Sequence, residues 1–137
     1  MKLIIGREII EMLIEMAKNS SAEVCGFLLG RREGEDVLVS EVKQVRNRLS
    51  SPSAFEMEPL EMVKVLDEAD ERGLEVVGIF HSHLRCPPVP SERDLKGMEN
   101  WRVPWLIVTP KGEVRTWILG EGEVEEVELI QVPQSKT

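Results

Sequence analysis

Residues 73–94 read GLEVVGIFHSHLRCPPVPSERD, and this stretch decides the predicted fold. Glu75–Phe80 is apolar and rich in β-branched residues, so we expect a buried strand there. This strand delivers the only two histidines of the chain, His81 and His83, at its C-terminal end. A proline-rich loop follows, and Ser91 begins a short helix. A buried strand that leads into a helix favours the α/β class.

Two longer helices are expected outside this stretch. Residues 7–18 carry apolar side chains at helical spacing, and polar residues follow at 19–20. Pro59 stands at the start of a second helical pattern, where a helix tolerates proline, and Gly73 ends that pattern.

The other apolar runs predict strands joined mainly by short turns. These runs are residues 22–29, 37–45, 103–108, 114–119 and 124–132. We therefore expect an α/β fold with a curved, mostly antiparallel β-sheet, one long helix on either side and a short helix after the loop that follows His83. Residues 1–132 are expected to form one domain, and residues 133–137 a flexible C-terminal tail.

Composition excludes several classes of protein. The net charge is −8 and the pI is near 4.9, which argues against a nucleic-acid binder because no basic surplus exists to neutralise phosphates. No apolar run reaches the roughly 18 residues needed to span a membrane, and no signal peptide is visible. A cytoplasmic location without a membrane partner is therefore expected. The sequence leaves the oligomeric state open, a homodimer included.

The two histidines lie two residues apart, as His81-Ser82-His83. If the preceding strand continues through them, alternate side chains share a face, and both imidazoles lie together. Two imidazoles held side by side are typical of half a metal site. The alternative is a pair of hydrogen-bonded structural histidines, and the pair alone does not decide between the two.

A carboxylate after the histidines favours the metal site. Asp94 lies eleven residues after His83, far enough for the loop between them to fold back. Two histidines and one carboxylate leave the fourth tetrahedral position of zinc open for water, which is the catalytic pattern. Ser91 and Asp94 also come close to a helix capping box. The two interpretations are compatible, because a helix capped by Ser91 would aim Asp94.

A general base is also required, and Glu23 is the candidate. It begins the apolar run Glu23–Gly30, EVCGFLLG. A carboxylate that enters a core strand costs free energy unless it is paired or has a function. Glu8, Glu11 and Glu15 also lie upstream, so position alone does not select Glu23.

These residues together resemble a known motif. Glu23 in EVCGFLLG, His81-Ser82-His83, seven residues, Ser91, two residues and Asp94 is similar to the motif of the JAMM (MPN-plus) zinc metallopeptidases, prokaryotic single-domain type. The likeness covers roughly residues 1–119, and the combined motif is specific where its parts are not. It implies a cytidine-deaminase-like JAMM/MPN fold and one Zn²⁺ per chain on His81, His83 and Asp94. It also implies that Glu23 is the acid/base and that Ser91 donates a hydrogen bond to the oxyanion.

The resemblance further implies a hydrolase that cuts a peptide or isopeptide bond after the C-terminal tail of a ubiquitin-like small modifier or a sulfur-carrier protein. Such a tail could add as a strand to an exposed sheet edge. We expect tail contacts at Asn47 and Phe55, and at Leu84 and Cys86 in the loop after His83. Leu84 departs from the family, which commonly has proline directly after the second histidine, and this puts substrate detail in doubt.

Three other functions remain to be weighed. A two-histidine, one-carboxylate set also suits a non-haem iron oxygenase, although such enzymes usually have all-β folds. A zinc nucleobase deaminase would need a His-x-Glu and a Pro-Cys-x-x-Cys pattern, and the chain has neither. The third is a non-catalytic scaffold that retains its metal and binds a protein partner.

The chain has two cysteines, too few for a secreted disulfide scaffold. Cys25 is expected as a small buried hydrophobe, and Cys86 as an accessible thiol in the proline-rich loop. A disulfide between them is a hypothesis that requires Cα atoms within about 7 Å.

Overall fold

A computed structural model describes residues 1–133 of the chain. Within these residues the elements follow in the order β1 (Lys2–Gly6), α1 (Arg7–Lys18), β2 (Cys25–Glu33), β3 (Asp36–Val45), α2 (Pro59–Glu71), β4 (Glu75–Ser82), α3 (Glu92–Asn100), β5 (Trp105–Val108), β6 (Val114–Leu119) and β7 (Val124–Val132). The predicted helices are thereby confirmed to within a residue at each end. Of the predicted C-terminal tail, only Pro133 lies inside the described residues.

The strands of the described residues close into a barrel in the order β1-β3-β2-β4-β5-β6-β7. β1 closes the ring, because it pairs in parallel with both neighbours: Leu3 lies opposite Val37 of β3 and opposite Leu129 of β7. We expected a curved sheet with one long helix on either side, and the structure corrects this: the sheet closes into a barrel. The α/β class is confirmed. β1 itself was not predicted, since its short apolar run shows neither alternation nor a turn signal before it.

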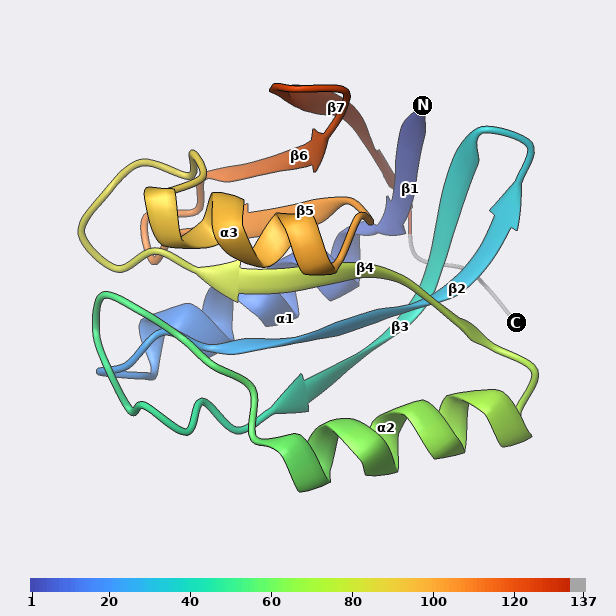
Figure 1. Cartoon of the computed structure of the whole chain (residues 1–137). Coiled ribbons are helices and arrows are strands. Elements are labelled where there is room, and N and C mark those ends of the chain that lie inside the picture. The colour runs from blue at the N-terminus through green and yellow to red at the C-terminus, as the bar shows by residue number, and fades with distance from the viewer. Residues whose placement is uncertain (134–137) are drawn as a thin grey trace.

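The barrel wall is apolar on both faces, and each face is covered by different helices. Along β2, Leu28 packs into a core with Leu13 of α1, whereas Phe27 packs into a second core with Val65 of α2 and Met98 of α3. Figure 1 shows α1 behind the strands and α3 in front of them. In the same view α2 lies below the strands, along the lower edge of the molecule. Alternation along β2 therefore fixes which residues face which helix.

Close packing of β2 against its neighbours requires glycine beside the site. A Cβ atom on Gly26 would overlap the carbonyl oxygen of Lys43 and the ring of Phe80. Phe80 lies opposite Gly26 and directly precedes His81. The absence of a side chain at Gly26 thus lets β4 carry its histidines into a tightly packed wall.

In the described part of the chain, no helix combines the length and the apolar composition that crossing a bilayer requires.

Candidate metal centre

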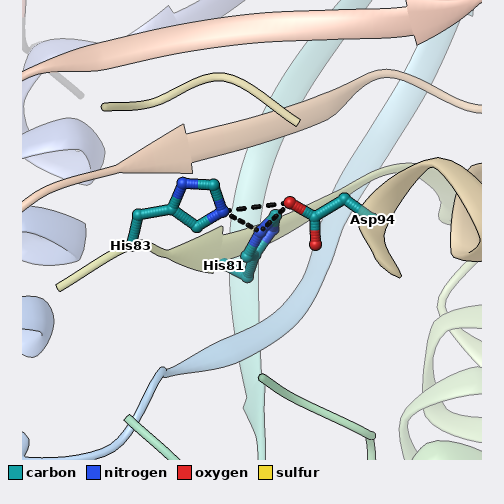
Figure 2. Close-up of side chains that lie close together, drawn as sticks. All are labelled: His81, His83 and Asp94. Atoms are coloured by element: carbon teal, nitrogen blue, oxygen red, sulfur yellow. Dashed lines mark hydrogen bonds and ion pairs between the residues drawn. The ribbon is translucent and has the colours of Figure 1, made fainter. Parts of the chain in front are cut away.

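The two histidines lie at the end of β4, buried in the barrel wall. His81 is opposite Ile107 of β5, and the backbone N–H of His83 donates to the carbonyl of Val108 at 2.9 Å. Both ring Nε2 atoms face the same point, as the alternation predicted (Figure 2). Ser82 between them points elsewhere: its Oγ accepts a 2.9 Å hydrogen bond from the backbone N–H of Val24.

Asp94 reaches the histidines from the first turn of α3. The Oγ of Ser91 accepts a hydrogen bond from the backbone N–H of Asp94 at 3.1 Å, and Asp94 Oδ2 accepts one from the backbone N–H of Ser91 at 3.0 Å. This reciprocal pair is a capping box, so the cap interpretation is confirmed. The same Oδ2 lies beside both imidazoles, so the cap also aims the carboxylate at them.

Three potential ligand atoms converge on one point. The Nε2 atoms of His81 and His83 are 3.2 Å apart, and Asp94 Oδ2 is 3.1 Å from the first and 3.0 Å from the second. Ligands about 2.0–2.1 Å from a tetrahedral zinc ion are roughly 3.3 Å apart, so the triangle has nearly the size that zinc requires. The fourth corner of such a tetrahedron belongs to none of the three side chains.

The hydrogen-bond chemistry of the cluster also suits a cation. His83 Nδ1 lies 2.8 Å from the carbonyl oxygen of Pro87, which can only accept, so Nδ1 carries a proton. In the neutral ring, Nε2 of His83 then presents a lone pair to Asp94 Oδ2, which is also an acceptor. Two acceptors 3.0 Å apart need a proton or a cation between them, and the residues present therefore fit a zinc ion.

The ionisation of the cluster follows from burial and from the interactions among its members. Burial opposes the charge of Asp94, but the interactions of this carboxylate with His81 and His83 outweigh burial and hold the pKa of that carboxyl well below its ordinary value. Burial lowers the pKa of His81, although Asp94 partly offsets this. A carboxylate that stays ionised beside a neutral imidazole is the protonation state in which both side chains can bind a metal.

Glu23 lies two residues before the start of β2, with only 5% of its surface exposed. The pKa of its carboxyl is raised from 4.5 to about 7: burial is the largest cause, His83 and Arg93 lower the pKa, and the charge of Asp94 raises it. These three residues belong to the metal cluster and its helix, so Glu23 shares their electrostatic environment. A carboxyl with a pKa near neutrality can both accept and release a proton at the pH of a cell.

The loop that follows β3 fixes the backbone of Glu23. The carbonyl of Ser51 accepts from the N–H of Glu23 at 2.8 Å, and Asn47 Nδ2 donates to the carbonyl of Glu23 at 3.0 Å. Asn47 is buried, and its second bond from Nδ2 reaches the carbonyl of Ala54 at 3.0 Å. Its Oδ1 accepts from the N–H groups of Leu49 and Glu56, both at 3.1 Å. All hydrogen-bonding positions of this amide are used inside the protein.

A cavity of about 850 Å³ opens beside Asp94, between α3, the start of α2 and the segment that follows residue 52. We call it the aromatic pocket, because its apolar lining consists mainly of large side chains: Phe55, Met57, Met62, Trp101 and Trp105. Phe55 also covers His81, with 4.6 Å between ring centroids. An apolar pocket that opens beside a polar cluster is the usual form of a small binding site.

Comparison with known proteins identifies the family. The family model described as prokaryotic homologs of the JAB domain matches residues 7–120. This chain belongs to that family. The chain is 50% identical over 129 residues to a desampylase of Pyrococcus furiosus, covering 93% of this chain and 89% of the relative. The JAMM relationship is thereby confirmed, and the chain is a hydrolase of the isopeptidase class.

A second curated relative and a solved structure are also similar to this JAB-family chain. It is 36% identical over 121 residues to a probable TtuB-protein conjugate cleaving protease of Thermus thermophilus, covering 88% of this chain and 76% of the relative. A protein of Desulfitobacterium hafniense with a solution structure has a TM-score of 0.85 and 27% identity, covering 96% of this chain and 94% of that one. The fold described above is therefore shared with that solved structure.

The residues expected to contact a substrate tail lie in different surroundings. Phe55 is half-buried and lines the aromatic pocket. Leu84 and Cys86 line a separate depression of about 320 Å³, together with Lys111. Asn47 instead directs its amide into the protein. Whether these side chains touch a substrate stays a prediction.

Both cysteines are free. Cys25 is fully buried, as predicted, and its Sγ donates to the carbonyl of Val45 at 3.4 Å; burial raises the pKa of this thiol to about 12. Cys86 is exposed, as expected. The hypothetical disulfide between them is not formed.

Some positions that shape the site could not be found from the sequence. Ser82 joins β4 to Val24, the residue after Glu23, and Trp117 of β6 donates from Nε1 to the carbonyl of Pro88 at 2.8 Å. Both contacts join segments far apart in the chain, and neither residue carries a local signal. For Asn47, the polar loop around it was the only signal, and it suggested exposure.

Proposed function

We propose that this chain uses one zinc ion, held by His81, His83 and Asp94, to hydrolyse the peptide or isopeptide bond after the C-terminal tail of a ubiquitin-like small modifier or a sulfur-carrier protein. The observation that carries the proposal is the convergence of these three buried side chains within 4.8 Å of one another. The names of the two relatives, a desampylase and a protease of TtuB conjugates, support the substrate class.

Zinc bound at this cluster would act as a Lewis acid on the carbonyl and would acidify a water molecule to a pKa of about 7. Glu23 accepts the proton of the attacking water: its buried carboxylate shares the electrostatic environment of the cluster, and burial makes it a stronger base than an exposed carboxylate. As the carbon–nitrogen bond breaks, Glu23 gives this proton to the departing amine. The carboxyl thus returns to its starting state at the end of each cycle.

Ser91 donates a hydrogen bond to the carbonyl oxygen as negative charge develops there. Its Oγ already accepts from the backbone N–H of Asp94, so the orientation of the oxygen is fixed while its own proton stays available. Ser91 is exposed at the edge of the aromatic pocket, where a substrate carbonyl can reach it. A well-placed donor of this kind contributes about 3 kcal/mol to transition-state stabilisation.

The aromatic pocket is the place that we assign to the substrate tail. Ser91 and Asp94 belong to its lining, and Phe55 and Trp101 provide apolar surface for an extended peptide. Strand addition at the barrel next to the cluster is less favourable than the sequence suggested. β4 is paired on both sides there, with β2 and with β5.

The alternative of a non-catalytic scaffold has less support, because two relatives that the chain matches over most of their length are named for cleavage reactions. The test is cleavage of a ubiquitin-like protein fused or isopeptide-linked through its C-terminus, with zinc and with a chelator. We expect zinc-dependent release by wild type, loss in Glu23→Gln with zinc retained, and no loss in Glu11→Gln, which changes an exposed carboxylate on α1 in the same way. Substantial turnover by pure Glu23→Gln protein would overturn the role of Glu23. One bound zinc with no cleavage of any such substrate would overturn the substrate class.

A further inference from the structure

The loop at 84–90 is held at two adjacent carbonyl groups. The carbonyl of Pro87 accepts from His83 Nδ1 at 2.8 Å, and the carbonyl of Pro88 accepts from Trp117 Nε1 at 2.8 Å. The first bond comes from the end of β4, and the second from β6, 29 residues further along the chain than Pro88. A single short segment therefore connects a proposed zinc ligand to a distant strand.

We propose that Trp117 is a positioning residue for His83: its indole N–H fixes the Pro87-Pro88 segment so that the carbonyl of Pro87 holds the ring of His83 in one tautomer and one orientation. This inference rests on the proposed zinc site, because it concerns how one of the ligands is prepared for the metal. Trp117 lies outside the motif. Its side chain makes no hydrogen bond to the side chain of any proposed zinc ligand.

The two prolines make this coupling effective. Each ring fixes φ near −65°, so a hydrogen bond at the carbonyl of Pro88 also restricts the peptide plane of Pro87. Neither proline has a backbone N–H, so this segment can be anchored only through its carbonyls. The N–H of Val89 turns back to the carbonyl of Pro87 at 2.8 Å, which tightens the segment further.

Trp117 is itself held in place. The guanidinium of Arg115 lies 4.5 Å from the centroid of its ring, a cation–π contact. Arg115 in turn donates two hydrogen bonds to the carboxylate of Glu126 on β7, at 2.9 and 2.7 Å. The indole is therefore held at one ring face by Arg115 while its N–H, in the ring plane, donates to the loop.

The orientation of His83 matters because its two nitrogens have different tasks. Donation from Nδ1 to Pro87 leaves the lone pair of Nε2 directed at His81 and Asp94, and Figure 2 shows Nδ1 facing away from them. Outer partners that fix a ligand in this way typically change metal affinity by about 10–100-fold when removed.

The experiment compares wild type with Trp117→Phe, which removes the indole N–H and keeps an aromatic ring. Thr116→Val is the matched control on the same strand, because its buried Oγ1 has no hydrogen-bond partner among the described residues and the change is isosteric. Zinc affinity is measured by competition with a chromogenic chelator. Side-chain ¹⁵N NMR of the metal-free proteins reports the tautomer, and with two histidines in the chain only two rings contribute.

At a pH high enough for both rings to be neutral, we expect the Nδ1–H tautomer for His83 in wild type and in Thr116→Val. In Trp117→Phe we expect a mixture of tautomers and a zinc affinity about 3- to 10-fold weaker, less than for a direct partner of the ligand. Wild-type tautomer and affinity in Trp117→Phe would overturn the inference. Should that variant not fold, 3-benzothienylalanine at position 117 keeps the bicyclic ring, removes only the donor, and is read in the same way.

The two proposals fail separately. Absence of stoichiometric zinc from wild type would overturn the proposed zinc site, yet the metal-free spectra would still decide whether Trp117 fixes the ring of His83. Normal zinc binding by both proteins, together with identical spectra, would overturn only the role of Trp117.

Discussion

Replacing Glu23 by glutamine should make the metal-free protein increasingly more stable than wild type as the pH rises. The pKa of Glu23 is raised from 4.5 to about 7, mainly by burial, with a smaller contribution from the charge of Asp94. Between these values the folded state holds a proton that the unfolded chain has released. The free energy of unfolding of wild type therefore falls as pH rises through this range, and it stays low above it. Glutamine does not titrate, so the free energy of unfolding of the variant lacks this decrease with pH.

The size of the effect follows from the two pKa values. At about 1.36 kcal/mol per pKa unit, a rise from 4.5 to about 7 corresponds to roughly 3 kcal/mol. The carboxyl is not completely withdrawn from solvent, which screens part of its interactions, so we expect about 2 kcal/mol between about pH 5 and about pH 8.

The assay is urea unfolding with chelator present, at about pH 5 and about pH 8. The measured quantity is the free energy of unfolding of Glu23→Gln minus that of wild type, compared between the two pH values. This comparison cancels the cost of burying an amide and the titration of groups common to both proteins. Glu11→Gln, with its exposed carboxylate, should give the same difference at both pH values. A difference for Glu23→Gln that is also independent of pH would refute the argument from burial.

Three further substitutions test the site. His81→Ala should abolish stoichiometric zinc binding, because it removes one of three proposed ligands; one zinc per chain in the purified variant would contradict the ligand set. Asn47→Ala should cost about 2–4 kcal/mol in urea unfolding, since buried backbone groups lose their partners, and it should lower turnover with zinc content unchanged. Ser91→Asp keeps an N-cap acceptor but loses the hydroxyl donor, so turnover should fall about 10²-fold at nearly constant stability. Full turnover by Ser91→Asp would mean that Ser91 serves only as the N-cap of α3.

Much of the site was predictable because its chemistry is local in sequence. The alternation of β4 places His81 and His83 on one face, and the capping box places Asp94 at the start of α3. Both features depend on spacings of two or three residues, which the sequence displays directly. The convergence of these side chains was therefore expected, and the structure has it.

The parts that were not predicted depend on contacts between distant segments. β1 has a plain apolar run, and only pairing with β3 and β7 makes it a strand that closes the barrel. Asn47 looks like a loop residue until its amide is seen to bridge Glu23 and Ala54. Trp117 carries no motif, and its importance lies in reaching Pro88. Such pairings are set by the tertiary fold and leave no periodic pattern in the chain.

The pairing of β1 with β7 has a consequence for how the protein is made. Lys2 meets Glu128 in this pairing, so the ring cannot close on a ribosome until nearly all of the described chain has emerged. β2, β3 and β4, whose strands pair with one another and carry both histidines, are available well before that. Closure of the barrel is thus the step with the largest loop entropy, and it is expected to be late and slow. A nascent chain would present its proposed zinc ligands while one side of the sheet is still open, and zinc taken up at that stage would favour completion of the fold.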